Sequence, residues 1–139
     1  MIVGSGAQKA ALKQLASSLG IADRVMFPGY AADTWPYYAS ATLFVLSSDY
    51  EGYPNVLVEA MRSGLAVIST DCESGPREIL DGGRFGRLVP VGNEVALADA
   101  IEAELVRPHN PDQVRDRAEA LSGAGTAQRY LDLLIGPQQ

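Results

Sequence analysis

Two glutamates eight positions apart, Glu51 and Glu59, are the residues of this chain whose types and spacing suggest chemistry. They stand on either side of Pro54, which fits the first position of a helix because its missing N–H would have no helical partner there. The predicted helix runs from Pro54 to about Ser63, and Gly64 ends it. Glu51 therefore lies ahead of the helix and Glu59 within it.

The start of this helix is a predicted binding site for a diphosphate. The amides of Asn55, Val56 and Leu57 have no partner within the helix, and they point outward with the positive end of the helix dipole. Gly52, in the preceding loop, lets the backbone come close to a ligand. Tyr53 belongs to the same loop and could stack on a sugar ring.

The two carboxylates have different predicted roles. The helix is apolar nearly all round and should be buried, so Glu59 would need hydrogen-bonding partners. Its side chain leans toward the helix N-terminus, where it could accept hydrogen bonds from both hydroxyls of a ribose. Glu51 could accept from sugar hydroxyls or lie near developing positive charge in a transition state. In the alternative interpretation, Glu59 is exposed and paired with Arg62, and Glu51 has no role.

Short strands without polar alternation, interleaved with helices, must position these residues. Strands buried on both faces predict an α/β fold, specifically a Rossmann-like doubly wound parallel sheet with helices on both sides. Ligands bind beyond the carboxyl ends of such strands, which directs attention to the loops there. We expect strands at 1–3, 25–27, 43–46, 66–69 and 86–89, helices at 11–19, 33–39, 54–63, 77–80, 94–106, 111–121 and 125–135, and the site in loops 4–7, 28–34, 47–54 and 70–76.

Gly4 and Gly6 follow the first expected strand and suggest a loop that could bind a dinucleotide. Lys9 stands where such a loop has its third glycine, and no acidic residue clearly ends the second strand. Dinucleotide binding is therefore disfavoured. A tight turn facing the binding cleft is the better interpretation.

The Ser74-Gly75-Pro76 turn has two interpretations. Ser74 could simply cap the short helix that follows. Alternatively, the turn lies beside a bound sugar with Arg77 near phosphate, and we favour a place in the cleft without assigning a specific role. Cys72 lies close by and is expected to be a small buried residue, because no nearby base would support nucleophilic catalysis.

Composition bounds the class of protein. The 139 residues suit one domain, with ordinary shares of apolar (47%) and charged (20%) residues. The net charge of −6 argues against nucleic acid and against electrostatic docking to anionic lipid. The single cysteine gives no disulfide framework, and the cytoplasm is the expected compartment. The sequence has no apolar run long enough for a membrane span and no metal-ligand cluster, and its one histidine, His109, is expected in a surface loop.

The segment from Glu51 to Glu59 resembles the E-x7-E signature of retaining GT-B glycosyltransferases, specifically family 4 (group 1). Several further blocks are similar to that family's, in its order, across residues 1 to about 105. The stretch from Thr70 to Leu80 resembles a subset that often uses UDP-linked hexoses or N-acetylhexosamines in bacterial glycan assembly. The other blocks are Val3-Gly4-Ser5-Gly6, Arg24-Val25-Met26-Phe27-Pro28-Gly29-Tyr30, Glu51-Gly52-Tyr53-Pro54-Asn55, Glu59-Ala60-Met61-Arg62-Ser63-Gly64 and Gly86-Arg87-Leu88-Val89.

The resemblance implies a metal-independent hexosyltransferase without a cofactor, and implies that residues 1–139 are its C-terminal, nucleotide-sugar-binding domain. Glu51 would be the catalytic residue at the donor sugar, residues 52–57 would hold the sugar and diphosphate, and Glu59 would bind the ribose. The region 27–31, which includes Tyr30, would border the base. The sugar would pass with retention from a nucleotide-diphosphate sugar to a glycan or lipid-linked acceptor.

The family also has an N-terminal domain that binds the acceptor and an Arg/Lys pair that neutralises the diphosphate, and neither lies in these residues. A doubly wound sheet rarely begins at the first residue, so Met1 suggests a piece of a longer protein. We expect the fragment alone to be inactive. The full-length enzyme could act at the inner face of the membrane.

Other classes of function remain open from sequence. One is a non-catalytic nucleotide-sugar-binding or interaction module that keeps the same fold. Another is a nucleotide-sugar epimerase, which would need the dinucleotide loop that Lys9 interrupts. A phosphorylase of the same architecture would instead depend on inorganic phosphate.

Overall fold

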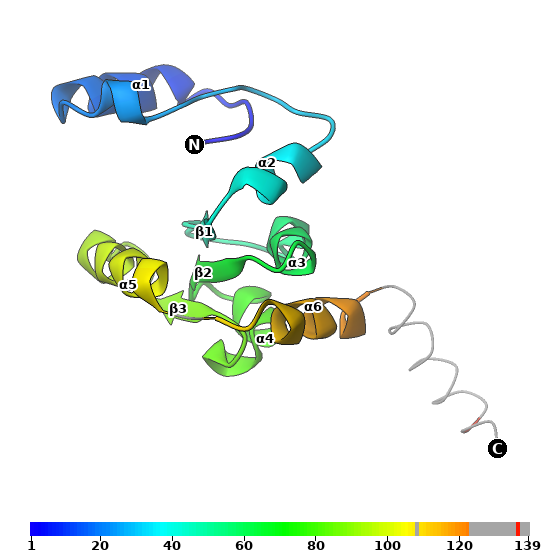
Figure 1. Cartoon of the computed structure of the whole chain (residues 1–139). Coiled ribbons are helices and arrows are strands. Elements are labelled where there is room, and N and C mark those ends of the chain that lie inside the picture. Colours follow the sequence, from blue (N-terminus) through cyan, green and yellow to red (C-terminus); the bar gives the residue numbers. More distant parts are fainter. Residues whose placement is uncertain (108, 123–135, 137–139) are drawn as a thin grey trace. The chain divides into compact units, whose positions relative to one another are not determined.

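The computed structural model describes residues 1–107, 109–122 and 136. The chain divides into two compact units, Met1–Pro36 and Tyr37–Gln139, and each is described by itself (Figure 1). The helices are α1 (Lys9–Ser18), α2 (Trp35–Ser40), α3 (Asn55–Arg62), α4 (Pro76–Ile79), α5 (Glu94–Val106) and α6 (Pro111–Ala120), the 3₁₀ turns are η1 (Ala22–Arg24) and η2 (Asp81–Gly83), and the strands are β1 (Leu43–Leu46), β2 (Ala66–Thr70) and β3 (Arg87–Val89).

The first unit forms a parallel bridge where two strands were expected. Val3 pairs with Gly29, and the segments predicted as strands, 1–3 and 25–27, contain no longer ladder in this unit. That prediction was wrong because it assumed burial on both faces. Met26, for example, is 62% exposed, so apolar packing does not hold these segments in an extended pair.

The second unit contains a three-stranded parallel sheet in the order β1-β2-β3. Leu43 lies opposite Ala66, and Ile68 lies opposite Arg87. Every residue of the central strand β2 is buried, as expected for a parallel sheet covered on both faces. The α/β prediction with a parallel sheet is therefore confirmed.

The two faces of this sheet have separate hydrophobic cores, and successive residues of a strand alternate between them. On β2, Val67 packs with α3, α4 and α6, whereas Ile68 packs with α5. Figure 1 shows α5 on one side of the strands and α3, α4 and α6 on the other. The core on the α3 side includes Leu57, Met61 and Leu80, all of which are fully buried.

The predicted helices of the second unit are present, with small differences at their ends. The helix expected at 94–106 has those bounds, whereas α3 begins one residue later than expected because Pro54 takes the N-cap position. Helices α4 and α6 correspond to the predictions at 77–80 and 111–121. The helix predicted at 125–135 lies outside the described residues.

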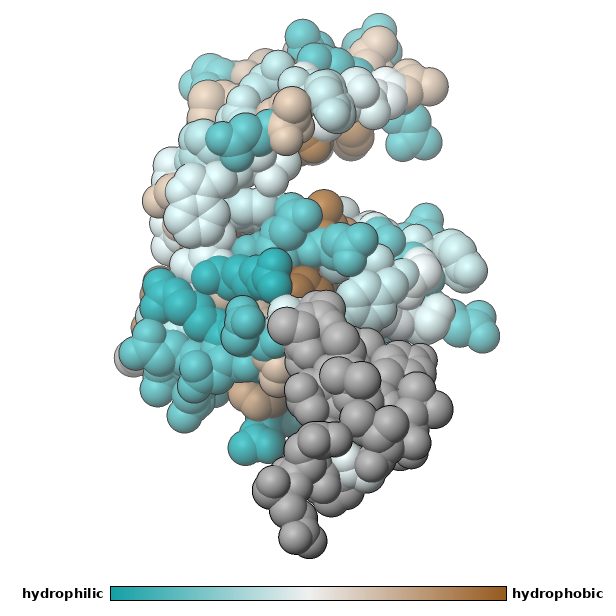
Figure 2. All heavy atoms as spheres, turned by 90° about the vertical axis from the view of Figure 1, so that its right-hand side faces the viewer, coloured by the Kyte–Doolittle hydropathy of each residue, from teal (hydrophilic) through white to brown (hydrophobic). Residues whose placement is uncertain are grey.

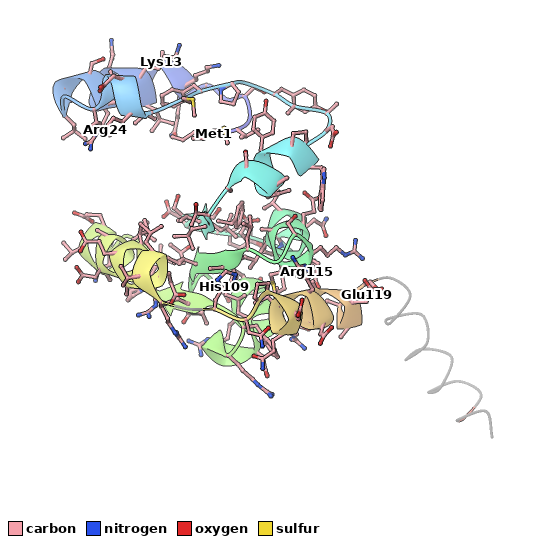
Figure 3. The ribbon with its side chains drawn as sticks, viewed as in Figure 1. Met1, Lys13, Arg24, His109, Arg115 and Glu119 are labelled. Atoms are coloured by element: carbon pink, nitrogen blue, oxygen red, sulfur yellow. The ribbon has the colours of Figure 1, made fainter. Side chains whose placement is uncertain are left out.

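Side chains in and next to α6 form hydrogen bonds with backbone carbonyls at the carboxyl ends of α3 and α4. Arg115 donates to the Ser63 carbonyl at 3.4 Å, and His109 Nε2 lies 2.9 Å from the carbonyl oxygen of Gly64. Arg117 donates to two carbonyls at the end of α4. Figure 3 labels His109 and Arg115. These bonds satisfy carbonyls that a helix leaves without partners, so His109 has a structural contact in addition to its surface position.

Gly86, just before β3, is predicted to be intolerant of a side chain. A Cβ there would lie 2.5 Å from Val67 Cγ2 and 2.8 Å from the Val67 carbonyl oxygen. We expect Gly86→Ala to lower the free energy of unfolding by about 1–3 kcal/mol, the usual cost of overpacking. Urea denaturation measures this change. Gly6→Ala, where a Cβ meets no atom within 4 Å, is the matched control, and equal denaturation midpoints for the two variants would contradict the prediction.

Candidate functional site

The loops that follow β1 and β2 meet at the carboxyl edge of the sheet. The hydroxyl of Thr70, buried at the end of β2, donates to the carbonyl of Ser48 in the loop after β1. Farther along the same contact, the hydroxyl of Ser74, in the loop after β2, donates to the Glu51 carbonyl at 3.3 Å. The structure therefore places these two predicted loops together, as the topology of a parallel sheet requires.

The Glu51 carboxylate is held by its own loop. The hydroxyl of Ser48 donates to Glu51 Oε1 at 2.6 Å in a half-buried setting. Because Thr70 fixes the Ser48 carbonyl, a chain of hydrogen bonds connects the end of β2 to this carboxylate. Neither Ser48 nor Thr70 was predicted from sequence as a site residue. Their signal was only a serine three residues before a loop glutamate and a polar residue that ends an apolar strand.

Gly75 allows the two loops to approach each other. Its φ is +87°, and a Cβ at this position would lie 2.6 Å from both the Gly52 carbonyl oxygen and Pro54 Cδ. Ser74 also has a left-handed backbone, with φ of 60°. The N-cap position of α4 belongs to Gly75 and not to Ser74, so the interpretation of Ser74 as a helix cap was wrong. Its hydroxyl instead donates to the carbonyls of Glu51 and Glu73.

The N-terminus of α3 opens at this edge without a side-chain cap. Asn55 and Val56 are exposed, and their amides belong to the first turn, where a helix offers no acceptor. The amide of Leu57, predicted to be equally available, donates to the Pro54 carbonyl at 3.0 Å. This bond spans three residues, as in a 3₁₀ helix, and it gives the Leu57 amide a partner within the chain. Two backbone donors, and not three, therefore face solvent with the positive end of the helix.

Glu59 is exposed, and its predicted burial was wrong. Helix α3 buries one face and leaves Val56, 41% exposed, on the same side as Glu59. In Figure 2, which faces α3 and α6, hydrophilic residues are prominent among the described residues of the second unit. The hydroxyl of Tyr38 donates to Glu59 Oε2 at 3.1 Å. Arg62, the alternative partner considered for Glu59, lies 4.0 Å from Glu119.

Tyr38, on α2, takes part in this arrangement. Its ring packs edge-on against Phe44, with centroids 5.9 Å apart. Its hydroxyl also reaches the carboxylate of Glu59. Tyr38 therefore orients Glu59 from α2, through a contact between residues 21 positions apart that spacing does not reveal.

Arg77, considered as a phosphate ligand, is engaged by a carboxylate of the loop after β2. Its Nε donates to Asp71 Oδ1 at 3.1 Å, and its Nη2 donates to the other oxygen. In this bidentate pair, the Asp71 carboxylate balances the charge of the Arg77 guanidinium. A phosphate would have to share Arg77 with Asp71, so the structure does not favour Arg77 as a dedicated phosphate ligand.

The remaining candidates are divided between the two units. Tyr53, in the Glu51 loop, is 47% exposed, and Cys72 is buried as expected. Gly4 and Tyr30 belong to the first unit, where Gly4 donates to the Gly29 carbonyl at 2.7 Å and Tyr30 is 78% exposed. Gly6, also in that unit, has open space where a Cβ would be.

Within residues 1–107, 109–122 and 136, no group of three or more His, Cys, Asp or Glu side chains could hold a metal ion. None of the helices within the same ranges combines the length and the apolarity needed to cross a bilayer.

Comparison with known proteins supplies a family for this arrangement. The family model described as Glycosyl transferases group 1 matches residues 1–107. A Campylobacter jejuni relative, N-acetylgalactosamine-N,N'-diacetylbacillosaminyl-diphospho-undecaprenol 4-alpha-N-acetylgalactosaminyltransferase, is 31% identical over 140 residues. The match covers 98% of this chain and 38% of that relative. The chain thus spans less than half of the relative's length.

Solved structures agree on the fold. The apo form of the lipopolysaccharide outer core galactosyltransferase WaaB has a TM-score of 0.84 at 24% identity, covering 96% of this chain and 39% of WaaB. Anabaena Alr3699/HepE in complex with UDP has a TM-score of 0.77 at 25% identity, covering 97% of this chain and 40% of HepE. The structural neighbours are GT-B glycosyltransferases.

Proposed function

The chain belongs to the group 1 glycosyltransferases, and we propose that it is the domain of such an enzyme that binds the nucleotide-diphosphate sugar. Observations at the carboxyl edge of β1 and β2 carry this proposal. There a positioned carboxylate, Glu51, lies in the loop that leads directly into the uncapped N-terminus of α3. A negatively charged diphosphate and a sugar with a developing positive charge need these two kinds of group side by side.

In the proposed complex, the amides of Asn55 and Val56 donate hydrogen bonds to the diphosphate oxygens, and Gly52 and Tyr53 border the sugar. The helix dipole stabilises negative charge on the departing diphosphate. Glu51 lies near the anomeric carbon, where its carboxylate stabilises positive charge in the transition state. The acceptor attacks from the face that the diphosphate leaves, and the sugar is transferred with retention.

We propose a UDP-linked hexose or N-acetylhexosamine as the donor. The HepE structure contains UDP, and the Campylobacter jejuni relative is named as an N-acetylgalactosaminyltransferase. That name also includes a diphospho-undecaprenol acceptor, which supports a glycan or lipid-linked acceptor here. Because the chain covers 38% of that relative, we assign the acceptor site to another domain and expect the 139-residue chain alone to be inactive.

Titration of the chain with UDP, followed by amide NMR, tests the proposal. We expect millimolar UDP to shift the amides of residues 52–56 and the signals of Glu59. Uridine, which lacks the diphosphate, should produce much weaker shifts at Asn55 and Val56 because only phosphate engages those amides. Shifts confined to other residues, or none at millimolar UDP, would show that this edge is not a nucleotide site.

Glu59 is proposed to accept hydrogen bonds from the ribose hydroxyls, with Tyr38 holding the carboxylate in place. Loss of hydrogen bonds to a charged acceptor costs about 1.5–3 kcal/mol, so Glu59→Gln should weaken UDP binding by about tenfold or more. Isothermal titration calorimetry measures the affinity. Glu73→Gln removes a charge from another exposed carboxylate and is the control.

A comparison of UDP with 2′-deoxy-UDP tests whether Glu59 binds the ribose. The wild-type chain should bind 2′-deoxy-UDP more weakly than UDP, because the ribose has lost one of the two hydroxyls. The Glu59→Gln variant should discriminate less between these ligands. A full difference between UDP and 2′-deoxy-UDP in the variant would refute the ribose assignment.

A further inference from the structure

A cavity of about 490 Å³ opens at the amino-terminal ends of β2 and β3. Its lining includes Ala66 and Val67 at the start of β2, and Gly86 and Arg87 at the start of β3. The proposed donor site lies at the opposite, carboxyl ends of the strands, so the two sites are separate. The volume falls within the range of about 300–1,000 Å³ that is usual for small-molecule sites.

The cavity has an excess of positive charge. Its lining contains three arginines, Arg84, Arg87 and Arg107, and one carboxylate, Glu104. Glu104 has a side chain only 9% exposed and is shared by Arg87, at 3.0 Å, and Arg107, at 3.4 Å. Arg84 lies 3.7 Å from Asp81, and both are mainly exposed, so this pair is weak. The excess is local, because the whole chain has a net charge of −6.

Polar groups from the start of α6 complete the cavity. Asn110 caps this helix and lines the cavity with Gln113. The oxygen of the Asn110 side chain accepts the Gln113 amide at 3.3 Å, which leaves the side-chain N–H groups of Asn110 as donors. The start of α6 therefore contributes polar side chains to the lining, while its amides at Asp112 and Gln113 are already bonded to Asn110. His109, also in the lining, is engaged with the Gly64 carbonyl at 2.9 Å and is not counted as a ligand.

We propose that this cavity binds a phosphate-bearing anion, with Arg84 and Arg107 as its main ligands and Asn110 as an additional donor. The guanidinium fork matches two oxygens of a phosphate, and the cavity lining holds three arginines and one carboxylate. The cavity is larger than inorganic phosphate, so the natural anion carries an attached group. That group is either a soluble phosphate ester or the headgroup of an anionic phospholipid. The proposal does not depend on the function assigned to the carboxyl edge.

Two probes distinguish these sources in the 139-residue chain. Inorganic phosphate is titrated into the protein while the amides are followed by NMR. Vesicles of phosphatidylglycerol, with phosphatidylcholine vesicles as the neutral comparison, are tested by co-sedimentation. We expect saturable shifts of the amides at 84–88 and 109–113, or co-sedimentation with phosphatidylglycerol vesicles alone.

The double variant Arg84→Gln/Arg107→Gln should weaken this binding by about tenfold or more, since it removes two charged donors. The two arginine side chains are 74% and 65% exposed, so folding should be retained, and unchanged amide dispersion elsewhere would verify it. Arg84→Gln alone, which leaves the Glu104 pairs intact, is the second variant. Arg24→Gln/Arg62→Gln removes the same charge from exposed positions outside the cavity and is the matched control; Figure 3 labels Arg24.

Each outcome decides the proposal. Phosphate binding that is lost in the cavity variants assigns the site to soluble phosphate esters. Binding only to phosphatidylglycerol vesicles, with the same loss, assigns it to a lipid headgroup. Absence of binding to both probes, shifts confined to residues 52–56, or equal weakening in the control variant would overturn the proposal.

Discussion

Glu51→Gln should lower the kcat of the intact transferase by about 100- to 1,000-fold, the usual effect of removing one electrostatic stabiliser of a transition state. Gln has nearly the same size as Glu, and its side-chain oxygen can still accept the hydrogen bond that Ser48 donates at 2.6 Å. The loop should therefore keep its conformation. What the variant lacks is the negative charge that we propose lies near the anomeric carbon.

The kinetic pattern distinguishes this role from binding. If the charge acts as proposed, mainly when positive charge develops on the sugar, kcat should fall while the KM for the donor changes little. Release of the nucleoside diphosphate, measured by chromatography at several donor concentrations, gives both constants. A variant that raises KM and leaves kcat unchanged would make Glu51 a binding residue only.

Glu73→Gln is the matched control for charge. Glu73 lies in the neighbouring loop after β2, is exposed, and its carbonyl accepts from Ser74 at 2.8 Å. Removing this charge should leave kcat within about twofold, since surface substitutions away from a site have small effects. Similar losses of kcat in both variants would point to the general charge of the edge and not to Glu51.

The elements around the site could be predicted because their signals are local. Apolar runs without polar alternation gave β1 and β2, and a parallel sheet requires the loops after neighbouring strands to share an edge. The helix predicted at 94–106 is α5, and the structure shows that Asn93 caps it by accepting the Ala96 amide. These features depend on residues close in sequence, where periodicity and turn chemistry carry most of the information.

Several errors and omissions concern the partners and the exposure of individual side chains. The burial of Glu59 was inferred from the apolar residues of α3. In this eight-residue helix, however, the apolar residue Val56 is exposed, on the same side as Glu59. Thr70 reaches Ser48 across 22 positions, and Asp71 pairs with Arg77 only because the loop after β2 folds back. Periodicity does not encode such side-chain partners; the register of the strands and the loop conformations determine them.

Gly75→Ala should lower the free energy of unfolding by about 3 kcal/mol, which combines strained backbone with overpacking. The φ of +87° is unfavourable for a residue with a Cβ, and that atom would lie 2.6 Å from both the Gly52 carbonyl oxygen and Pro54 Cδ. Neither neighbour is the end of a flexible side chain. The Glu51 loop must therefore move, or Gly75 must leave its conformation.

Gly92→Ala separates the two contributions. Gly92 also has a left-handed backbone, with φ of +70°, but a Cβ there would meet no atom within 4 Å. This control should cost about 1–2 kcal/mol, the strain of a left-handed residue alone. Denaturant unfolding of both variants gives the difference. Equal losses of stability would show that the contact between Gly75 and the Glu51 loop does not constrain the backbone.

The same substitution should also affect the proposed donor site in conditions where the variant remains folded. Displacement of Gly52 and Pro54 moves Glu51 and the first turn of α3 together, because Pro54 is the N-cap of that helix. We therefore expect Gly75→Ala to lose the UDP-dependent amide shifts at residues 52–56, whereas Gly92→Ala should retain them. Normal UDP shifts in a folded Gly75→Ala variant would mean that the donor site does not require the close contact between the two loops.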